Sequence, residues 1–160
     1  MLVVRQTNDT DYKLALDVFG FYLGISSTTA LISKDYEEIE KAVLSGSSFV
    51  SLLDNVVVGF VTFREWEDFV EPMTLIVSPD CRRQGIGSQL MSKMIDFFRR
   101  RFPKKTITVF ANEKSISIML ENGLVQFDRS EVPDFLKGVY VTQLADPKFD
   151  SIVFAMSVDK

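Results

Sequence analysis

The segment with the clearest potential for chemistry spans residues 74–90 and reads TLIVSPDCRRQGIGSQL. In it Arg82 and Arg83 precede Gly85 and Gly87, and an amphipathic helical pattern begins directly afterwards. The first backbone N–H groups of a helix lack intrahelical partners, and the helix dipole adds partial positive charge at that end. Glycine lets an anion approach the backbone, and the arginines add fixed charge. The segment is therefore predicted to bind a pyrophosphate.

Two common phosphate-binding motifs do not fit this segment. A Walker loop requires Gly-x4-Gly-Lys-Ser/Thr, which is absent, and a dinucleotide fingerprint requires a third glycine where Leu90 stands. Two simpler interpretations compete with an anion site. The glycines could form only a tight turn between a strand and a helix, and the arginines could be a solvated surface pair.

Composition excludes several functional classes. The chain has 160 residues, 46% of them hydrophobic and 25% charged, which predicts one globular domain over residues 1–160. Histidine is absent, so histidine triads, histidine metal sites and zinc fingers are excluded, and we expect no metal. The net charge of −4 argues against a broad basic surface for nucleic acid. With one cysteine, and with neither a membrane helix nor a signal peptide, we expect a cytoplasmic protein that acts away from membranes.

The elements that must position this segment follow from hydrophobic periodicity. A two-residue turn, Asp54-Asn55, predicts a hairpin, and Gly123 is placed to end a short helix. The order predicts an α/β domain in which an antiparallel meander runs into a βαβ crossover. The expected strands are Leu2–Gln6, Phe49–Leu53, Val56–Arg64, Val70–Val77, Thr106–Ala111, Leu124–Asp128, Val139–Leu144 and Ile152–Val158. The expected helices are Thr10–Leu23 capped by Thr10, one capped by Ser33, Gly85–Arg101 and Lys114–Asn122.

The pattern R-x-x-G-x-G after a strand ending L-x-V-x-P resembles motif A of the GNAT superfamily of acyl-CoA N-acyltransferases. It is carried here by residues 82–87 after residues 75–79. The resemblance continues at Asn112 and at the closing Gly123, where family members have Tyr-x-x-x-Gly-Phe. In this chain Met119 stands in the tyrosine position and Leu124 in that of the phenylalanine. The resemblance implies the GNAT fold, a mixed central β-sheet with helices on both faces.

The resemblance also implies a co-substrate and a set of binding residues. Acetyl-CoA would place its pantetheine arm between splayed fourth and fifth strands, and a primary amine of a small molecule or peptide would attack the thioester directly. The implied pantetheine contacts are Leu75, Ile76 and Val77, with Asn112 near the inner end of the arm. The implied pyrophosphate contacts are Arg82, Arg83, Gln84, Gly85, Ile86, Gly87 and Ser88.

Glu71 is the candidate catalytic base. It stands four residues before Leu75, at the position that matches the catalytic glutamate of histone-type family members. An amine with a pKa near ~10 must lose a proton before it attacks, and burial in an apolar strand would raise the pKa of this carboxyl to a useful value. A strand-end glutamate in solvent is the alternative. Glu65, Glu67 and Asp68 compete for the same role.

Met119 leaves the reaction without an obvious proton donor. A methionine at helical spacing is typical of packing, and a thiolate can leave without an acid, so its presence does not forbid transfer. Tyr140 could substitute for the missing tyrosine. The second hypothesis is a catalytically inactive acetyl-CoA-binding sensor or partner subunit. The sequence leaves open the acceptor amine and whether the chain forms a homodimer.

Overall fold

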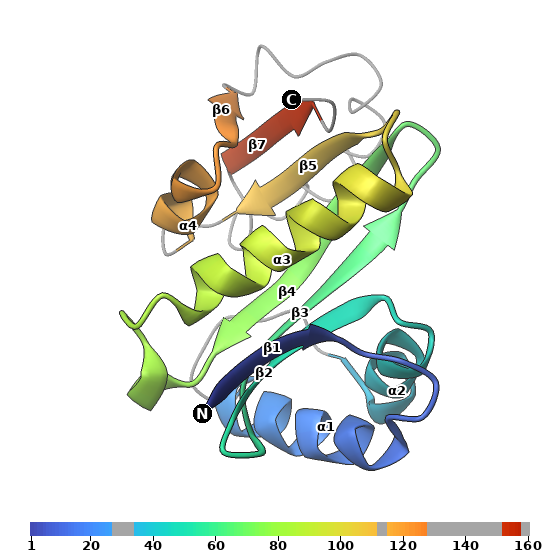
Figure 1. Cartoon of the computed structure of the whole chain (residues 1–160), viewed down its shortest axis with the longest axis vertical. Helices are drawn as coiled ribbons and strands as arrows, with labels where there is room; N and C mark the ends of the chain where they lie inside the picture. Colours follow the sequence, from blue (N-terminus) through green and yellow to red (C-terminus); the bar gives the residue numbers. More distant parts are fainter. Residues whose placement is uncertain (27–33, 112–114, 128–151, 158–160) are drawn as a thin grey trace.

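A mixed β-sheet forms the centre of the molecule (Figure 1). The structure, a computed structural model, describes residues 1–26, 34–111, 115–127 and 152–157. Within them seven strands lie in the order β1-β2-β3-β4-β5-β7-β6. They are β1 (Leu2–Gln6), β2 (Ser48–Leu53), β3 (Val56–Glu65), β4 (Phe69–Val77), β5 (Thr106–Ala111), β6 (Val125–Phe127) and β7 (Ile152–Ser157). The helices are α1 (Tyr12–Ser26), α2 (Tyr36–Leu44), α3 (Ile86–Arg101) and α4 (Ile116–Glu121), with a 3₁₀ turn η1 (Pro79–Cys81).

The strand order confirms the predicted topology. Strands β1 to β4 pair antiparallel in sequence order. Helix α3 then crosses over the sheet and returns the chain to β5, which pairs parallel to β4. The remaining pairs, β5 with β7 and β7 with β6, are antiparallel. The predicted meander and βαβ crossover are both present.

Helices cover both faces of the sheet, as expected. On one face α1 and α2 pack over β2 and β3, where Val50 and Phe60 are fully buried. On the other face α3 packs over the sequence neighbours of these two residues, Phe49 and Val61. Successive strand residues point to opposite faces, so neighbours in sequence enter different cores. None of the helices in the described ranges has the length and apolar character to span a membrane.

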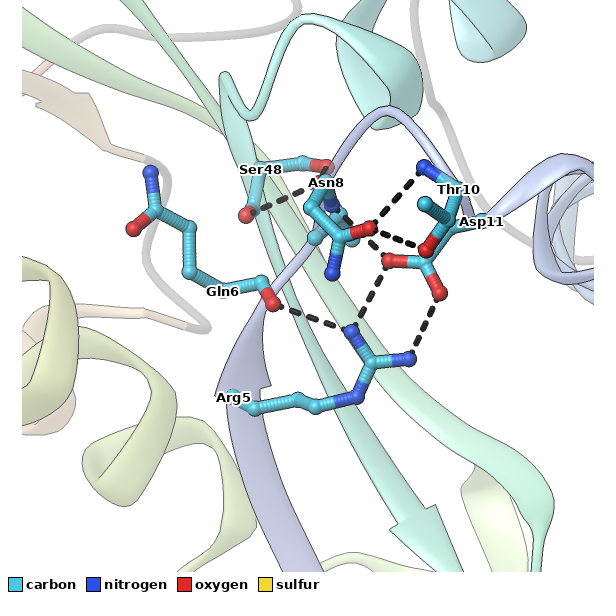
Figure 2. A network of polar contacts seen from close by, with 7 residues as sticks. Arg5, Gln6, Asn8, Thr10, Asp11 and Ser48 are labelled. Carbon is cyan, nitrogen blue, oxygen red and sulfur yellow. Dashed lines mark hydrogen bonds and ion pairs between the residues drawn. The ribbon is translucent and has the colours of Figure 1, made fainter.

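A polar network joins the end of β1 to the start of α1 (Figure 2). The Arg5 guanidinium donates two hydrogen bonds of 2.8 Å to the carboxylate of Asp11. The Asn8 amide donates to the same carboxylate at 2.8 Å, and the Asn8 side-chain oxygen accepts from the Thr10 amide at 2.9 Å. Helix α1 begins at Tyr12, so the residue that precedes it is Asp11, and the predicted cap Thr10 is one residue early.

Other boundaries differ from prediction for local reasons. Helix α2 begins after Asp35, whose side chain forms a reciprocal capping box with Glu38. The predicted cap Ser33 lies outside the described residues, as does the predicted strand Val139–Leu144. The Asp54-Asn55 turn is confirmed, because both residues have the positive φ values, 48° and 67°, that a two-residue hairpin of this kind needs. Gly123 also has the expected left-handed conformation, at φ 83°.

Candidate active site

The loop that joins β4 to α3 holds two residues in the left-handed region. Arg83 has φ 61° and Gly85, the residue before α3, has φ 75°. A left-handed conformation costs a residue with a Cβ roughly 1–2 kcal/mol, and such strain is concentrated at functional sites. The chain also turns at η1, where the Cys81 amide donates to the Ser78 carbonyl at 2.9 Å. A tightly turned backbone of this kind can direct successive N–H groups toward one point.

The first turn of α3 presents unpaired backbone amides. The helix has no side-chain cap, and no hydrogen bond from the amides of Ile86, Gly87 or Ser88 occurs among the described residues. Arg82 and Arg83 are exposed, and neither forms an ion pair within the described ranges. Positive charge and free N–H groups therefore meet at one helix N-terminus, as the sequence predicts for an anion site.

The absence of a Cβ has a different structural consequence at each of the two glycines of this loop. A Cβ added at Gly85 would have only the Gln89 side chain within 4 Å, at 4.0 Å, so the residue borders open space. A Cβ added at Gly87 would approach Ile118 Cδ1 of α4 to 2.8 Å and Val77 of β4 to 3.6 Å. Gly87 thus allows α3 to pack closely against its neighbours. Of the two glycines, only Gly85 therefore leaves room for a phosphate.

Three further loop residues have side chains that contact other parts of the protein. The Ile86 side chain is buried in the core beneath α3, so only its backbone faces the loop. The Ser88 hydroxyl accepts a hydrogen bond of 3.1 Å from Asn122, whose amide also donates to the Ile118 carbonyl at 2.8 Å. Asn122 therefore links the end of α4 to the first turn of α3. Gln84 is exposed and donates to the Asp80 carbonyl at 3.5 Å.

Strands β4 and β5 pair over only their first residues. The paired positions are Phe69 with Thr106 and Val70 with Ile107, although β4 continues to Val77 and β5 to Ala111. Beyond Val70 the edge of β4 that faces β5 has no strand partner in the described part of the chain. Such an edge offers backbone N–H and C=O groups to an extended ligand. Leu75, Ile76 and Val77, the predicted pantetheine contacts, lie on this unpaired length.

A β-bulge bends β4 within the same unpaired length. Met73 is opposite Thr62 and Ile76 is opposite Phe60, so two residues between them face the single Val61 of β3. One of the two, Thr74, has φ 50°. A bulge increases the local twist and bends its strand. It also changes which side chains face each way, since Val77 packs under α3 whereas Ile76 packs under α1 and α2.

Glu71 is the first residue of β4 beyond the pairs with β5. It is 3% exposed, so the alternative of a solvated glutamate is wrong. The Trp66 indole donates a hydrogen bond of 2.8 Å to one carboxylate oxygen. The Arg64 guanidinium lies over the Trp66 ring, 4.1 Å from its centroid, and the ring of Phe69 stacks on Trp66 with the two centroids 5.5 Å apart. The contact of Trp66 with Glu71 was not predicted from the sequence, because it arises only when β3 and β4 lie side by side.

The three competing carboxylates lie where β3 ends and turns into β4, with Glu65 as the last residue of β3 and Glu67 and Asp68 in the turn. Glu65, Glu67 and Asp68 are all exposed. Glu65 is bound by Lys105 at 2.7 Å, and Lys105 also donates to the Trp66 carbonyl. Among these four acidic residues only Glu71 is buried.

Met119 packs in the core beneath α3 and is 2% exposed, so the interpretation of this methionine as a packing residue is confirmed. Asn112 and Tyr140 lie outside the described residues. Within the described ranges no three residues of the types Asp, Glu and Cys lie close enough together to hold a metal ion.

Comparison with known proteins identifies the family. The sequence pattern of the acetyltransferase (GNAT) family matches residues 17–123, and the chain belongs to this family. A probable N-acetyltransferase, camello, from Xenopus laevis is 30% identical over 138 residues, which cover 81% of this chain and 63% of that protein. The present chain thus spans less than two thirds of that relative.

Two solved structures share the fold at low sequence identity. N-acetylglutamate synthase from Neisseria gonorrhoeae, complexed with coenzyme A and N-acetyl-glutamate, is 16% identical with a TM-score of 0.74. That match covers 100% of this chain and 36% of the synthase. A GNAT-family acetyltransferase from Staphylococcus aureus Mu50 is 19% identical with a TM-score of 0.67, covering 99% of both chains.

Proposed function

We propose that this chain is an N-acetyltransferase that moves an acetyl group from acetyl-CoA to a primary amine of a small molecule or peptide. One observation carries the proposal. Strand β4 leaves β5 directly after Val70, so that buried Glu71 lies at the narrow end of the divergence. The loop with free amides follows the other end of β4. Acetyl-CoA carries its thioester and its pyrophosphate at opposite ends of an extended arm, so it requires a reactive group and an anion site at the two ends of one unpaired strand.

The residues present fit acetyl-CoA. The amides of Gly85 to Ser88 would bind the pyrophosphate, and Arg82 and Arg83 would add positive charge beside it. The open space at Gly85 supports this assignment. The unpaired edge of β4 at Leu75 to Val77 would bind the pantetheine arm as an additional strand does. When bound, acetyl-CoA supplies the activated acyl group.

Glu71 is proposed as the base that takes a proton from the amine, directly or through one water molecule. An amine attacks only in its neutral form, and a positioned base contributes about 10²–10⁴-fold to such a reaction. The 2.8 Å hydrogen bond from Trp66 holds one carboxylate oxygen in place. Burial excludes the solvent that would otherwise compete for the carboxylate.

A catalytically inactive acetyl-CoA-binding sensor or partner subunit is the second candidate. The observation that favours it is Met119, a thioether where a hydroxyl donor is expected in the family pattern, packed into the core at 2% exposure. An inactive sensor would keep the phosphate loop and the unpaired edge of β4. It would have no need of the buried carboxylate at Glu71, which is why transfer is the preferred function.

Steady-state turnover separates the two candidates. The chain is incubated with acetyl-CoA and a panel of primary amines, including amino acids, polyamines, aminoglycosides and N-terminal peptides, and release of free thiol is followed. The transferase predicts amine-dependent thiol release with at least one acceptor. A sensor predicts binding of acetyl-CoA by calorimetry with no amine-dependent release from any member of the panel.

A further inference from the structure

Thr108 carries a hydroxyl group that the fold buries without satisfying it. The residue lies in β5 with 0% exposure, and its Oγ1 has no hydrogen-bond partner in the described part of the chain. Buried hydroxyls are nearly always hydrogen-bonded, because an unsatisfied one reduces the free energy of unfolding. The hydroxyl of Thr108 is therefore available to a partner that does not belong to the chain, and the position of the residue decides what that partner is.

The position of Thr108 connects it with the proposed active site. Val70 and Ile107 form the last pair between β4 and β5, and Glu71 and Thr108 are the next residues on the two strands. Val70 and Ile107 both belong to the core beneath α3. Because strand side chains alternate, Glu71 and Thr108 leave the sheet on the opposite face. They therefore flank the point at which the two strands separate.

The two side chains reach different distances from the sheet. A threonine hydroxyl is one bond from Cβ, so Oγ1 of Thr108 stays near the plane of the sheet. The carboxylate of Glu71 lies two bonds further out. An acyl group at the end of an arm between β4 and β5 would lie near that plane, while an amine would approach from the face opposite α3. The shorter side chain suits the acyl group and the longer one suits the amine.

We propose that the Thr108 hydroxyl donates a hydrogen bond to the acetyl carbonyl oxygen of bound acetyl-CoA; this inference rests on the proposed function. As the amine nitrogen bonds to the carbonyl carbon, that oxygen gains negative charge, which a positioned donor stabilises. The C–S bond then breaks and sulfur keeps its electron pair, while Glu71 takes the proton that the amine loses. Thr108 keeps its own proton throughout.

The test uses two substitutions at this position and one matched control. Thr108→Val keeps the shape of the side chain and removes the hydroxyl, whereas Thr108→Ser keeps the hydroxyl. Ser51→Ala is the control, because Ser51 Oγ is the other buried hydroxyl without a partner among the described residues. Ser51 lies in β2, which is separated from β5 by β3 and β4.

Calorimetry gives the affinity of each variant for acetyl-CoA and for coenzyme A without an acyl group. Thr108→Val should weaken acetyl-CoA binding about 3–10-fold, the effect of one lost hydrogen bond, and leave coenzyme A binding unchanged. Its thermal unfolding midpoint should be equal to or above that of the original chain, because a buried unsatisfied group is removed. Thr108→Ser and Ser51→Ala should keep the original ratio of the two affinities.

Two results would overturn the role of Thr108. One is that Thr108→Val keeps the original affinity for both ligands, and the other is that it loses the same factor of affinity for both. Turnover is measured separately. If the original chain binds acetyl-CoA but acetylates no amine, the proposed transferase fails while the affinity ratio still decides the role of Thr108. If it binds neither ligand, both proposals are wrong.

Discussion

Glu71 is buried, and its carboxylate accepts a hydrogen bond of 2.8 Å from the Trp66 indole. Glu71→Gln retains the size of the side chain and an oxygen that can accept from Trp66, and it removes only the capacity to take a proton. We expect turnover to fall by about 10²-fold or more with acetyl-CoA affinity almost unchanged. Steady-state kinetics with the best acceptor of the panel, together with calorimetry, measures both quantities.

Glu65→Gln is the control for this substitution, because it neutralises an exposed carboxylate at the end of the neighbouring strand β3. It should alter turnover by less than threefold. If Glu71→Gln keeps turnover within threefold at neutral pH, the base is another residue, and the turn that carries Glu67 and Asp68 is the first place to look.

Strand β1 and helix α1 are held together by the ion pair between Arg5 and Asp11, whose side chains are 36% and 11% exposed. The hydrogen bond from Arg5 is the main reason that the pKa of Asp11 is lowered. A carboxyl whose pKa is lowered in the folded state stabilises that state at pH values above the pKa that the carboxyl has in the unfolded chain. That contribution is lost as the pH falls through the folded pKa.

Asp11→Asn should therefore lower the free energy of unfolding by about 1–3 kcal/mol at pH 7. The difference from the original chain should shrink as the pH falls below about 4, the ordinary pKa of an aspartate, and through the lower pKa of Asp11 in the folded state. Urea unfolding at pH 7, 5 and 3 measures this difference. Asp17→Asn, at an exposed position on α1, should show little loss at any pH. A loss for Asp11→Asn that stays constant from pH 7 to pH 3 would exclude the ionic origin.

At the scale of the whole molecule, local chemistry made most of the fold predictable. The Asp54-Asn55 turn, the helix after Gly85 and the strand Thr106–Ala111 are specified by residues that are neighbours in the sequence. Helix starts were less accurate, although the capping box at Asp35 and Glu38 is visible as a sequence pattern.

The candidate site also has parts that local sequence predicts and parts that it does not. The anion loop could be predicted, because one short segment supplies its glycines, arginines and helix start. The bulge at Thr74, the contact of Trp66 with Glu71 and the orphaned hydroxyl of Thr108 could not. Each depends on the register between strands that are distant in the sequence. Lys105, which donates to the Trp66 carbonyl across 39 residues, shows how far such contacts reach.

Calorimetric titration of acetyl-CoA into Gly85→Asp tests most directly whether this loop binds the pyrophosphate of acetyl-CoA. The aspartate places a negative charge where the phosphate would bind, so we predict at least a tenfold loss of affinity, since a charge-assisted hydrogen bond contributes about 1.5–3 kcal/mol. Gly46→Asp is the matched control, because Gly46 has φ 73° against 75° at Gly85 but lies between α2 and β2. The dissociation constant of Gly46→Asp should be unchanged. If folded Gly85→Asp binds acetyl-CoA as tightly as the original chain does, this loop does not bind the pyrophosphate.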